Sequence, residues 1–275
     1  MATKRFEGKV VWITGAGSGI GKALAIELSR QGATIAVSGR RRANLDEVVR
    51  AIESGGGRAL PVPCDVTDEA SLDEAVKTIV GQLGKLDVAV ANAGFSVSGS
   101  IRKLTAADWR RQLDTNVVGA ALTAKVALDA LEKTRGSVVL VGSVAAFVPS
   151  PNVGAYSASK AALRSLGQTL DIELSDTGIA VTVIHPGFVE SEIAQVDNQG
   201  RHDPSRPDRR PKNLMWPADQ AARVMARAIA ARKPELVFTG HGKVGAFLGQ
   251  HLPGVVRFAM RNGGGTRRAK AITKE

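Results

Sequence analysis

The residues whose types and spacing are best suited to catalysis are a tyrosine and a lysine that lie close together in the sequence. Tyr156, the only tyrosine of the chain, precedes Lys160 by four residues. An apolar pattern with helical spacing starts directly after the lysine, and on a helix this separation places the phenol and the ammonium on one face. A nearby fixed cation favours the phenolate and so lowers the phenol pKa, which is ordinarily about 10. The pair can therefore act as a general acid and base. A core tyrosine beside a solvated lysine is the alternative.

A glycine-rich stretch lies between the strand-like run 10–13 and the helical stretch 22–30. Gly15, Gly19 and Gly21 fit the spacing T-G-x-x-x-G-x-G, whereas G-x-G-x-x-G fails here. A glycine turn between a buried strand and a helix lets the backbone approach a pyrophosphate, which then lies at the helix N-terminus. The stretch predicts a dinucleotide cradle, with a merely flexible turn as the alternative.

Further motifs follow along the chain in a fixed order. They are Asn92-Ala93-Gly94 after a predicted strand, Asn116 in a predicted helix, Ser143 at the end of a strand, and Pro186-Gly187 after another strand. Together with the glycine turn and the tyrosine–lysine pair, these residues resemble the short-chain dehydrogenase/reductase family over about residues 6 to 240. The closest subtypes in pattern are NADP-preferring members that act on hydroxysteroids or long-chain ketones.

The elements that must position these residues alternate between strand and helix patterns. Strands are predicted near 9–14, 33–38, 58–63, 86–91, 136–142, 179–184 and 235–239, and helices lie between them, including long ones at about 105–132, 156–176 and 217–232. This order is typical of a parallel sheet with helices on both faces. The sequence therefore predicts an α/β protein, a single-domain Rossmann fold with a doubly wound, seven-stranded parallel sheet.

The predicted dehydrogenase domain spans residues 6–240 and includes a polar, proline-containing loop at 188–216. Loops of this length in compact domains are often lids. Residues 241–275 form a C-terminal amphipathic, basic extension, in which an apolar stripe of helical spacing is interrupted by Pro253-Gly254. Such a stripe implies one buried face.

The resemblance implies a catalytic set of Asn116, Ser143, Tyr156 and Lys160. Tyr156 would exchange a proton with the substrate oxygen, and Ser143 would hydrogen-bond that oxygen. Lys160 would lower the tyrosine pKa and hold the nicotinamide ribose, while Asn116 would hold a water that links Lys160 to solvent. A strand-end serine and an asparagine that bridges main chain are the structural alternatives.

The residues after the second predicted strand decide between the two nicotinamide cofactors. An acidic residue there would bind the ribose 2′-hydroxyl, whereas arginine suits a 2′-phosphate. Gly39 stands where NAD-preferring members of the family carry aspartate, and Arg40 follows, assisted by Arg41 and Ser38. We therefore expect NADP(H); the alternative is a solvated arginine run that opens a helix.

The remaining cofactor contacts are implied by the resemblance. They are Gly15, Ser18, Gly19, Ile20, Gly21, Asp65, Val66, Asn92, Gly94, Tyr156, Lys160, Pro186, Gly187, Val189 and Ser191. Asp65 would accept a hydrogen bond from the adenine amino group, although a helix N-cap is an alternative role, for which Thr67 or Asp68 is better placed. Ser191 stands where the family usually has a threonine for the carboxamide, and it keeps the hydroxyl.

Apolar residues near the inferred pocket favour a hydrophobic carbonyl or alcohol substrate, such as a steroid or a long-chain lipid ketone. They are Phe95, Val144, Phe147, Val153, Phe188, Leu214, Met215 and Trp216. The expected activity is interconversion of a carbonyl and a secondary alcohol. A non-catalytic dinucleotide-binding regulator on the same fold is the alternative.

Composition bounds the other classes of function. The lone Cys64 is expected to be a small buried residue at a strand end, and it lacks metal-ligand spacing with the four histidines, so no metal is predicted. The 37 basic and 26 acidic residues give +11, but only 4% of residues are aromatic, which disfavours nucleic-acid binding. Neither a spanning helix nor an export leader is indicated, so a cytoplasmic location is expected.

Two kinds of partner are expected beyond the substrate. The helices near 105–132 and 156–176 carry apolar faces that the family commonly pairs across a two-fold axis, which predicts a homodimer, with a tetramer as the alternative. The extension 241–275 follows its apolar stripe with Arg257, Arg261, Arg267, Arg268, Lys270 and Lys274 around Gly263-Gly264-Gly265. Peripheral contact with an anionic membrane is one reading, and a cover for the substrate pocket or a dimer partner is the other.

Overall fold

The computed structural model describes residues 4–262, which form one parallel seven-stranded sheet in the order β3-β2-β1-β4-β5-β6-β7. The strands are β1 Val10–Thr14, β2 Thr34–Ser38, β3 Arg58–Pro61, β4 Val88–Ala91, β5 Ser137–Val141, β6 Ala180–His185 and β7 Glu235–Val237. Every predicted strand is present, and the predicted single-domain Rossmann fold is confirmed.

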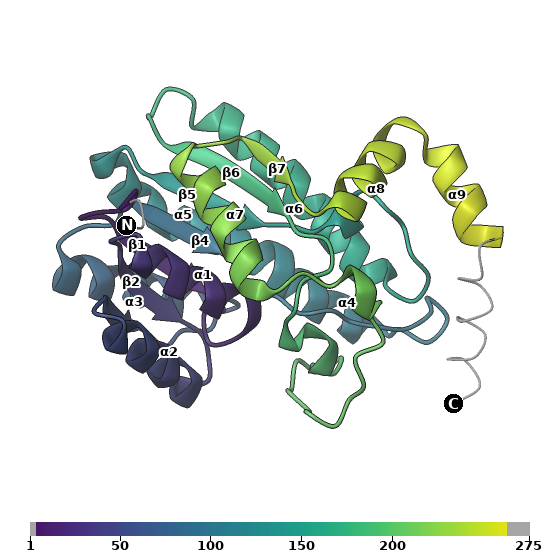
Figure 1. Ribbon diagram of the computed structural model, residues 1–275, viewed down its shortest axis with the longest axis horizontal. Coiled ribbons are helices and arrows are strands. Elements are labelled where there is room, and N and C mark those ends of the chain that lie inside the picture. Colours follow the sequence, from purple (N-terminus) through teal and green to yellow (C-terminus); the bar gives the residue numbers. More distant parts are fainter. Residues whose placement is uncertain (1–3, 263–275) are drawn as a thin grey trace.

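Helices cover both faces of this sheet (Figure 1). They are α1 Gly19–Arg30, α2 Arg42–Ser54 and α7 Ala218–Ala230 on one face, and α3 Glu69–Leu83, α5 Gly119–Thr134 and α6 Gly154–Glu173 on the other. Successive strand residues point to opposite faces, so Ile13 of β1 packs with the first group and Trp12 with the second. Because both faces are buried, the strands read as continuous apolar runs.

The strand order creates a crevice at the carboxyl ends of β1 and β4. The chain runs outward from β1 through β2 to β3 and then crosses to β4 on the other side. The loops that follow β1 and β4 therefore diverge, and such switch points are where ligands bind in open α/β sheets. The glycine-rich turn follows Thr14, and Asn92 directly follows β4.

The long helix predicted at about 105–132 is interrupted by a π-turn. The helix begins as α4 (Ala106–Leu113), passes through the π-helical segment Asp114–Val118, and continues as α5. A π-turn inserts one residue into an α-helix and is frequent at functional sites. Asn116 lies at its centre and is buried.

The predicted lid is irregular backbone that includes two short 3₁₀ turns, Glu192–Gln195 and Lys212–Leu214. Asn198 attaches the lid to the segment that follows β4 and to α4. The Asn198 side chain accepts a hydrogen bond from the Ser98 amide and donates one to the Ser98 carbonyl, at 2.9 and 3.0 Å. Arg111 of α4 donates to the Asn198 carbonyl at 2.9 Å.

Two helices, α8 (Gly240–His251) and α9 (Pro253–Asn262), end the described chain. The predicted break at Pro253-Gly254 is confirmed, but the domain itself buries little of the apolar stripe, and the predicted cover for its other residues stays a prediction. Val244, Phe247 and Val255 are more than half exposed. The predicted basic tail from Arg267 onward and the glycine run before it lie outside the described residues. Within residues 4–262, no helix combines the length and the apolarity needed to cross a bilayer.

Candidate active site

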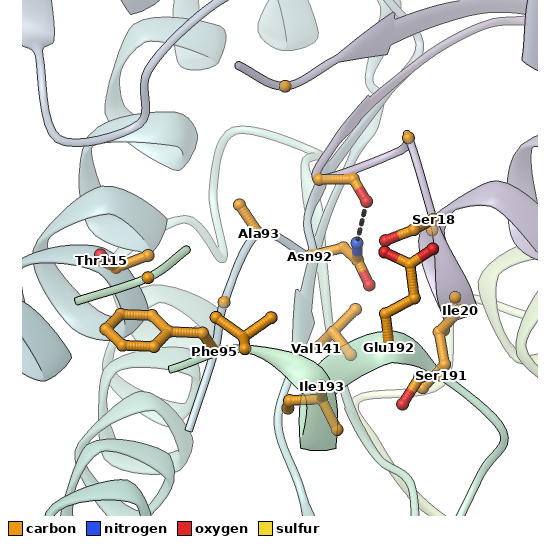
Figure 2. Close-up of a pocket in the computed structure, with 18 of the residues that line it drawn as sticks. Ser18, Ile20, Asn92, Ala93, Phe95, Thr115, Val141, Ser191, Glu192 and Ile193 are labelled. Carbon is orange, nitrogen blue, oxygen red and sulfur yellow. Dashed lines mark hydrogen bonds between the residues drawn. The ribbon is translucent and has the colours of Figure 1, made fainter. Parts of the chain in front are cut away.

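A cavity of about 550 Å³ lies at the carboxyl ends of the strands, lined by the loops that follow β1, β2, β4, β5 and β6 (Figure 2). Most predicted site residues converge on it. Those that line it are Gly15, Ser18, Gly19, Ile20, Gly21, Arg40, Arg41, Asp65, Val66, Asn92, Gly94, Ser143, Tyr156, Lys160, Pro186, Gly187, Val189 and Ser191. Ser38 and Asn116, also predicted as site residues, do not line it.

The glycine-rich turn requires glycine for close packing of backbone. Gly15 has φ +64°, a conformation that side chains disfavour. A Cβ on Gly21 would clash with the Gly15 carbonyl group and with the Asn92 side-chain amide. Ser18 is the N-cap of α1, but its side chain makes no cap hydrogen bond. The N-terminus of α1 therefore presents a hydroxyl and unpaired amides to the cavity.

The three residues implied in proton transfer meet at the other end of the cavity. Tyr156 and Lys160 both lie in the first two turns of α6, as predicted. The Tyr156 hydroxyl hydrogen-bonds the Ser143 side chain, whose oxygen also accepts the Ala145 amide at 3.1 Å. The Lys160 ammonium donates to the Val141 carbonyl at 2.8 Å and lies 5.8 Å from the centre of the tyrosine ring.

Burial dominates the electrostatics of this group. The pKa of Tyr156 is raised because burial penalises the phenolate, although the Ser143 hydrogen bond and the charge of Arg210 act in the opposite direction. Burial also lowers the pKa of Lys160 from 10.5 to about 8. Lys160 is not among the causes of this shift, and the lowering of the tyrosine pKa by Lys160 stays a prediction. The net shift is upward, and the cation that opposes it is Arg210.

Asn116 takes the main-chain bridging role that was the alternative. Its side-chain oxygen accepts the Phe95 amide at 3.1 Å, and its amide donates to the Phe95 carbonyl and to the Ser159 hydroxyl, both at 3.1 Å. Asn116 therefore fixes the loop after β4 against α6. A Cβ on Gly94 would lie 3.0 Å from the Asn116 side-chain oxygen, a tight contact, and 3.8 Å from the Lys160 nitrogen, so a larger residue there would press on the Asn116 side chain.

Arg40 and Arg41 lie at the opposite end of the cavity and contact the lid. Arg40 donates to the Gly200 carbonyl at 3.1 Å, and Arg41 pairs with Glu192 at 3.0 Å. Ser38, expected to assist them, does not reach the cavity. Its fully buried hydroxyl donates to the Val62 carbonyl and accepts the Trp12 indole N–H. Ser38 therefore links β2 to β1 and to the residue that follows β3.

The predicted adenosine contacts have partners of their own. The Asp65 carboxylate accepts the Thr67 amide and hydroxyl at 3.0 and 2.8 Å, whereas the N-cap of α3 is Asp68. Asn92 donates its side-chain amide to the Thr14 and Gly15 carbonyls at 2.9 and 3.1 Å, which ties β4 to the glycine turn. Both side chains still line the cavity.

Arg210 is the main site residue that sequence reasoning missed. It donates to the Val189 carbonyl, the Ser191 hydroxyl and the Ser191 carbonyl at 2.9, 3.1 and 2.8 Å, and it pairs with Asp208. It therefore holds the segment after Pro186-Gly187. Glu192, which reaches toward Ser18 in Figure 2, was also missed. Both come from the irregular lid, where no periodic pattern indicates a position.

The apolar residues expected near the substrate are mostly structural. Of the eight named from sequence, only Phe95 lines the cavity. Phe147 packs edge-on against His185 with ring centres 4.9 Å apart, and Trp216 packs against Phe238 at 5.8 Å. The lining instead includes Ile193 and Val196 of the lid, together with Val141. The lid therefore contributes apolar side chains to the cavity, but at Ile193 and Val196 and not at the lid positions named from sequence.

The described residues contain no cluster of metal-binding side chains. Cys64 is buried, as predicted, and lines the cavity. Burial raises the pKa of its thiol to about 11, so it stays protonated and unreactive at neutral pH.

Comparison with known proteins identifies the family. The short chain dehydrogenase family model matches residues 9–202. An uncharacterized oxidoreductase of Staphylococcus aureus (strain USA300) is 32% identical over 225 residues, which cover 82% of this chain and 96% of that protein. Another, of Myxococcus xanthus, is 38% identical over 187 residues, or 68% of this chain and 74% of that protein.

Two solved structures show the same fold. A short chain dehydrogenase/reductase from Burkholderia phymatum in complex with NAD has a TM-score of 0.80 and 25% identity, over 89% of this chain and 93% of that chain. A short chain dehydrogenase from Burkholderia cenocepacia in complex with NADP has a TM-score of 0.76 and 30% identity, over 87% of this chain and 99% of that chain. Both nicotinamide cofactors therefore occur among the structural neighbours.

Proposed function

This chain belongs to the short-chain dehydrogenase family and is an oxidoreductase of that type, and on this premise we propose that it uses NADP(H) to interconvert a carbonyl and a secondary alcohol. The observation that carries the proposal is the convergence of Ser143, Tyr156 and Lys160 at one end of a cavity whose other end holds Arg40 and Arg41. The first three residues can move a proton, and the arginines can bind a phosphate.

The cavity has features that fit a dinucleotide. The turn before α1 leaves no space for a Cβ at Gly21, and the helix N-terminus behind it favours negative charge. Ser18 would donate to the pyrophosphate, and Gly187, Val189 and Ser191 would face the nicotinamide. When bound, the cofactor supplies hydride to the carbonyl carbon or accepts it from the alcohol.

Proton transfer falls to the residues of this chain. In the direction of reduction, the neutral Tyr156 hydroxyl donates its proton to the substrate oxygen, where negative charge develops. The raised pKa of Tyr156 keeps the proton available at neutral pH. Ser143 stabilises the same oxygen by hydrogen bonding, and Lys160 supplies positive charge close to the ring. Asn116 acts indirectly, because it fixes the Phe95 loop against α6, the helix that carries Tyr156 and Lys160.

The preference for NADP(H) is supported by charge at the adenosine end. Gly39, Arg40 and Arg41 line the cavity after β2, without an acidic side chain among them to bind a ribose 2′-hydroxyl. A hydrophobic carbonyl substrate is supported by Phe95, Ile193 and Val196 on the cavity wall. The cytoplasmic location and the homodimer stay predictions.

The test is turnover of a panel of hydrophobic and polar carbonyls, followed through the nicotinamide absorbance with NADPH and with NADH. We expect reduction of hydrophobic ketones with NADPH. Tyr156→Phe should bind NADPH as the wild type does and lose about 100- to 10,000-fold in kcat, because the ring stays while the transferable proton is removed. Near wild-type kcat in that variant contradicts the mechanism. Cofactor binding without any turnover favours the regulator instead.

A further inference from the structure

The two C-terminal helices carry exposed apolar side chains that the dehydrogenase reaction does not need. We define the C-terminal surface as Val244 and Phe247 of α8, Leu252 between the helices, and Val255 and Phe258 of α9. These side chains are 60%, 60%, 48%, 55% and 71% exposed. Exposed apolar groups gathered on one segment mark an interaction site.

The helices leave this surface open because they bury other side chains. Gly242 and Ala246 are the buried residues of α8, and Val256 is the one buried residue of α9. Figure 1 shows α8 and α9 projecting from the end of the sheet, with α9 farthest from the body of the domain. The five side chains of the C-terminal surface therefore lie outside the fold's own core.

Charge on the same segment has a single sign. Residues 236–274 contain no Asp or Glu, and their basic residues are Lys243, Arg257, Arg261, Arg267, Arg268, Lys270 and Lys274. With Glu275 at the end, the last 40 residues carry a net charge of +6, more than half of the +11 of the whole chain. An uncharged protein partner would not require this excess, whereas an anionic surface would.

We propose that the C-terminal surface docks on an anionic lipid bilayer. Apolar side chains enter the interface while neighbouring basic groups pair with lipid phosphates, the pattern of peripheral membrane helices. A second copy of this chain fits less well, because a two-fold contact places like charges opposite each other. A nucleic acid would use the charges but leave Phe247 and Phe258 without an apolar partner.

Docking at this position is linked to the cavity. The His241 side chain, at the start of α8, accepts the Phe188 amide at 3.2 Å, and the two rings stack 5.4 Å apart. Phe188 directly follows Gly187, which lines the cavity. The membrane-bound helix would thus contact the loop that closes the site, which suits a substrate that partitions into lipid.

The test is co-sedimentation of the full-length protein with vesicles of phosphatidylcholine that contain or lack phosphatidylglycerol. We expect binding only to the anionic vesicles, and loss of binding at about 1 M salt, where the Debye length is about 3 Å. Phe258→Ser should weaken binding about tenfold. Ile101→Ser, which removes a side chain of matched exposure (74%) from the turn before α4, should not.

Three results would overturn the proposal. The first is a wild-type protein that ignores anionic vesicles at low salt. The second is a Phe258→Ser variant that binds vesicles as tightly as the wild type does. The third is a Phe258→Ser variant that loses an oligomer the Ile101→Ser variant keeps, which would assign the surface to a second copy of the chain.

A separate hydrogen-bond network connects the segment after β5, the end of β6 and the start of β7 with α6. His185, fully buried at the end of β6, faces the Ser143 carbonyl with Nδ1 at 3.2 Å and Glu235 of β7 with Nε2 at 2.9 Å. Arg164 donates to both oxygens of Glu235, at 2.6 and 3.2 Å. Because Arg164 follows Lys160 by four residues on α6, the network joins the backbone of Ser143 to the helix that carries Tyr156.

From this network we infer that His185 and Glu235 are positioning residues for Ser143, an inference that rests on the proposed function. They act through the Ser143 backbone and touch neither substrate nor cofactor. Phe147, four residues after Ser143, lies between His185 and Arg164, with its ring 4.7 Å from the guanidinium carbon, and completes the packing. Loss of His185 should let the Ser143 hydroxyl move away from Tyr156.

The sole tyrosine makes this inference testable without turnover. Ultraviolet titration at alkaline pH reports Tyr156 alone, and the Ser143 hydrogen bond lowers its pKa. His185→Ala should therefore raise the pKa of Tyr156 and reduce kcat about ten- to hundred-fold with NADPH affinity unchanged. Thr182→Val is the matched control, because Thr182 is buried on the same strand and its hydroxyl has no partner.

Rescue distinguishes positioning from simple packing. Glu235→Gln keeps an oxygen that can accept from His185 and should retain more activity than Glu235→Ala. An unchanged Tyr156 titration in a folded His185→Ala protein refutes the positioning role, whatever the activity is. Failure of the proposed function is a different result, namely a wild type without turnover whose tyrosine still responds to His185→Ala.

Discussion

Replacing Arg40 by alanine tests the cofactor assignment most directly. The guanidinium of Arg40 lies at the adenosine end of the cavity and donates to the Gly200 carbonyl at 3.1 Å. A 2′-phosphate that binds there would gain a charge-assisted hydrogen bond. NADH lacks that phosphate, so the substitution should weaken NADPH binding selectively.

The size of the effect follows from exchanging one bond for another. The bond from the Arg40 guanidinium to the Gly200 carbonyl already has a charged donor, whereas a phosphate would add a charged acceptor as well. If the phosphate displaces Gly200, we expect a net gain of about 1 to 2 kcal/mol, or roughly five- to thirtyfold in Kd. NADH affinity should change by less than about twofold, because NADH carries no group for that bond.

The assay is titration of both cofactors, followed by nicotinamide fluorescence, at two salt concentrations. Arg42→Ala is the matched control, since Arg42 belongs to the same basic run but pairs with Asp46 and does not line the cavity. Its Kd values should match the wild type. An Arg40→Ala protein that loses NADPH and NADH affinity equally would refute the phosphate assignment and leave Arg40 as a lid contact only.

Three further predictions concern the cradle, the sheet and the assembly. Gly21→Ala should abolish cofactor binding and lower Tm, because its Cβ would meet backbone, whereas Gly81→Ala in open space on α3 should be neutral or stabilising by about 0.5 to 1 kcal/mol in denaturant titrations. Asp87→Asn should destabilise the protein at neutral pH. Burial would raise the pKa of Asp87, but hydrogen bonds from Val10 and Lys9 outweigh it and lower that pKa. The stabilisation by the Asp87 carboxylate is therefore present above the unfolded pKa of 3.8 and lost as pH falls through the lower folded value. The difference in unfolding free energy between the wild type and Asp87→Asn should accordingly disappear in acid. Light scattering should give a dimer mass at micromolar concentration, and a monomer mass would contradict the predicted pairing of α5 and α6.

The fold was predictable because its signals are local. The strands are short runs of three to six residues, and most of their residues are apolar. The separation of Tyr156 from Lys160 also needs only the period of one helix. The cradle was predictable for the same reason, since Gly15 and Gly21 meet within a single turn.

The errors share a different cause, which is contact between distant segments. Ser38 follows the sequence pattern of a cofactor residue, but its hydroxyl is taken by Trp12 and Val62, which neighbouring strands bring to it. Arg210 and Glu192 belong to an irregular loop, where spacing carries no information. The sequence also could not show that burial raises the pKa of Tyr156.

Because of the π-turn at Asn116, the number of residues between α4 and α5 determines which sides of these two helices face the Phe95 loop and the core. An α-helix turns about 100° per residue, so one inserted residue rotates everything before it relative to everything after it. Gln112 and Asn116 thereby both bind the backbone of the Phe95 loop, while Ala120 and Ala124 keep facing the sheet. Deleting a single residue from 114–118 would give a regular α-helix. In that helix, the residues that bind the Phe95 loop and those that pack on the sheet could no longer make their contacts at the same time.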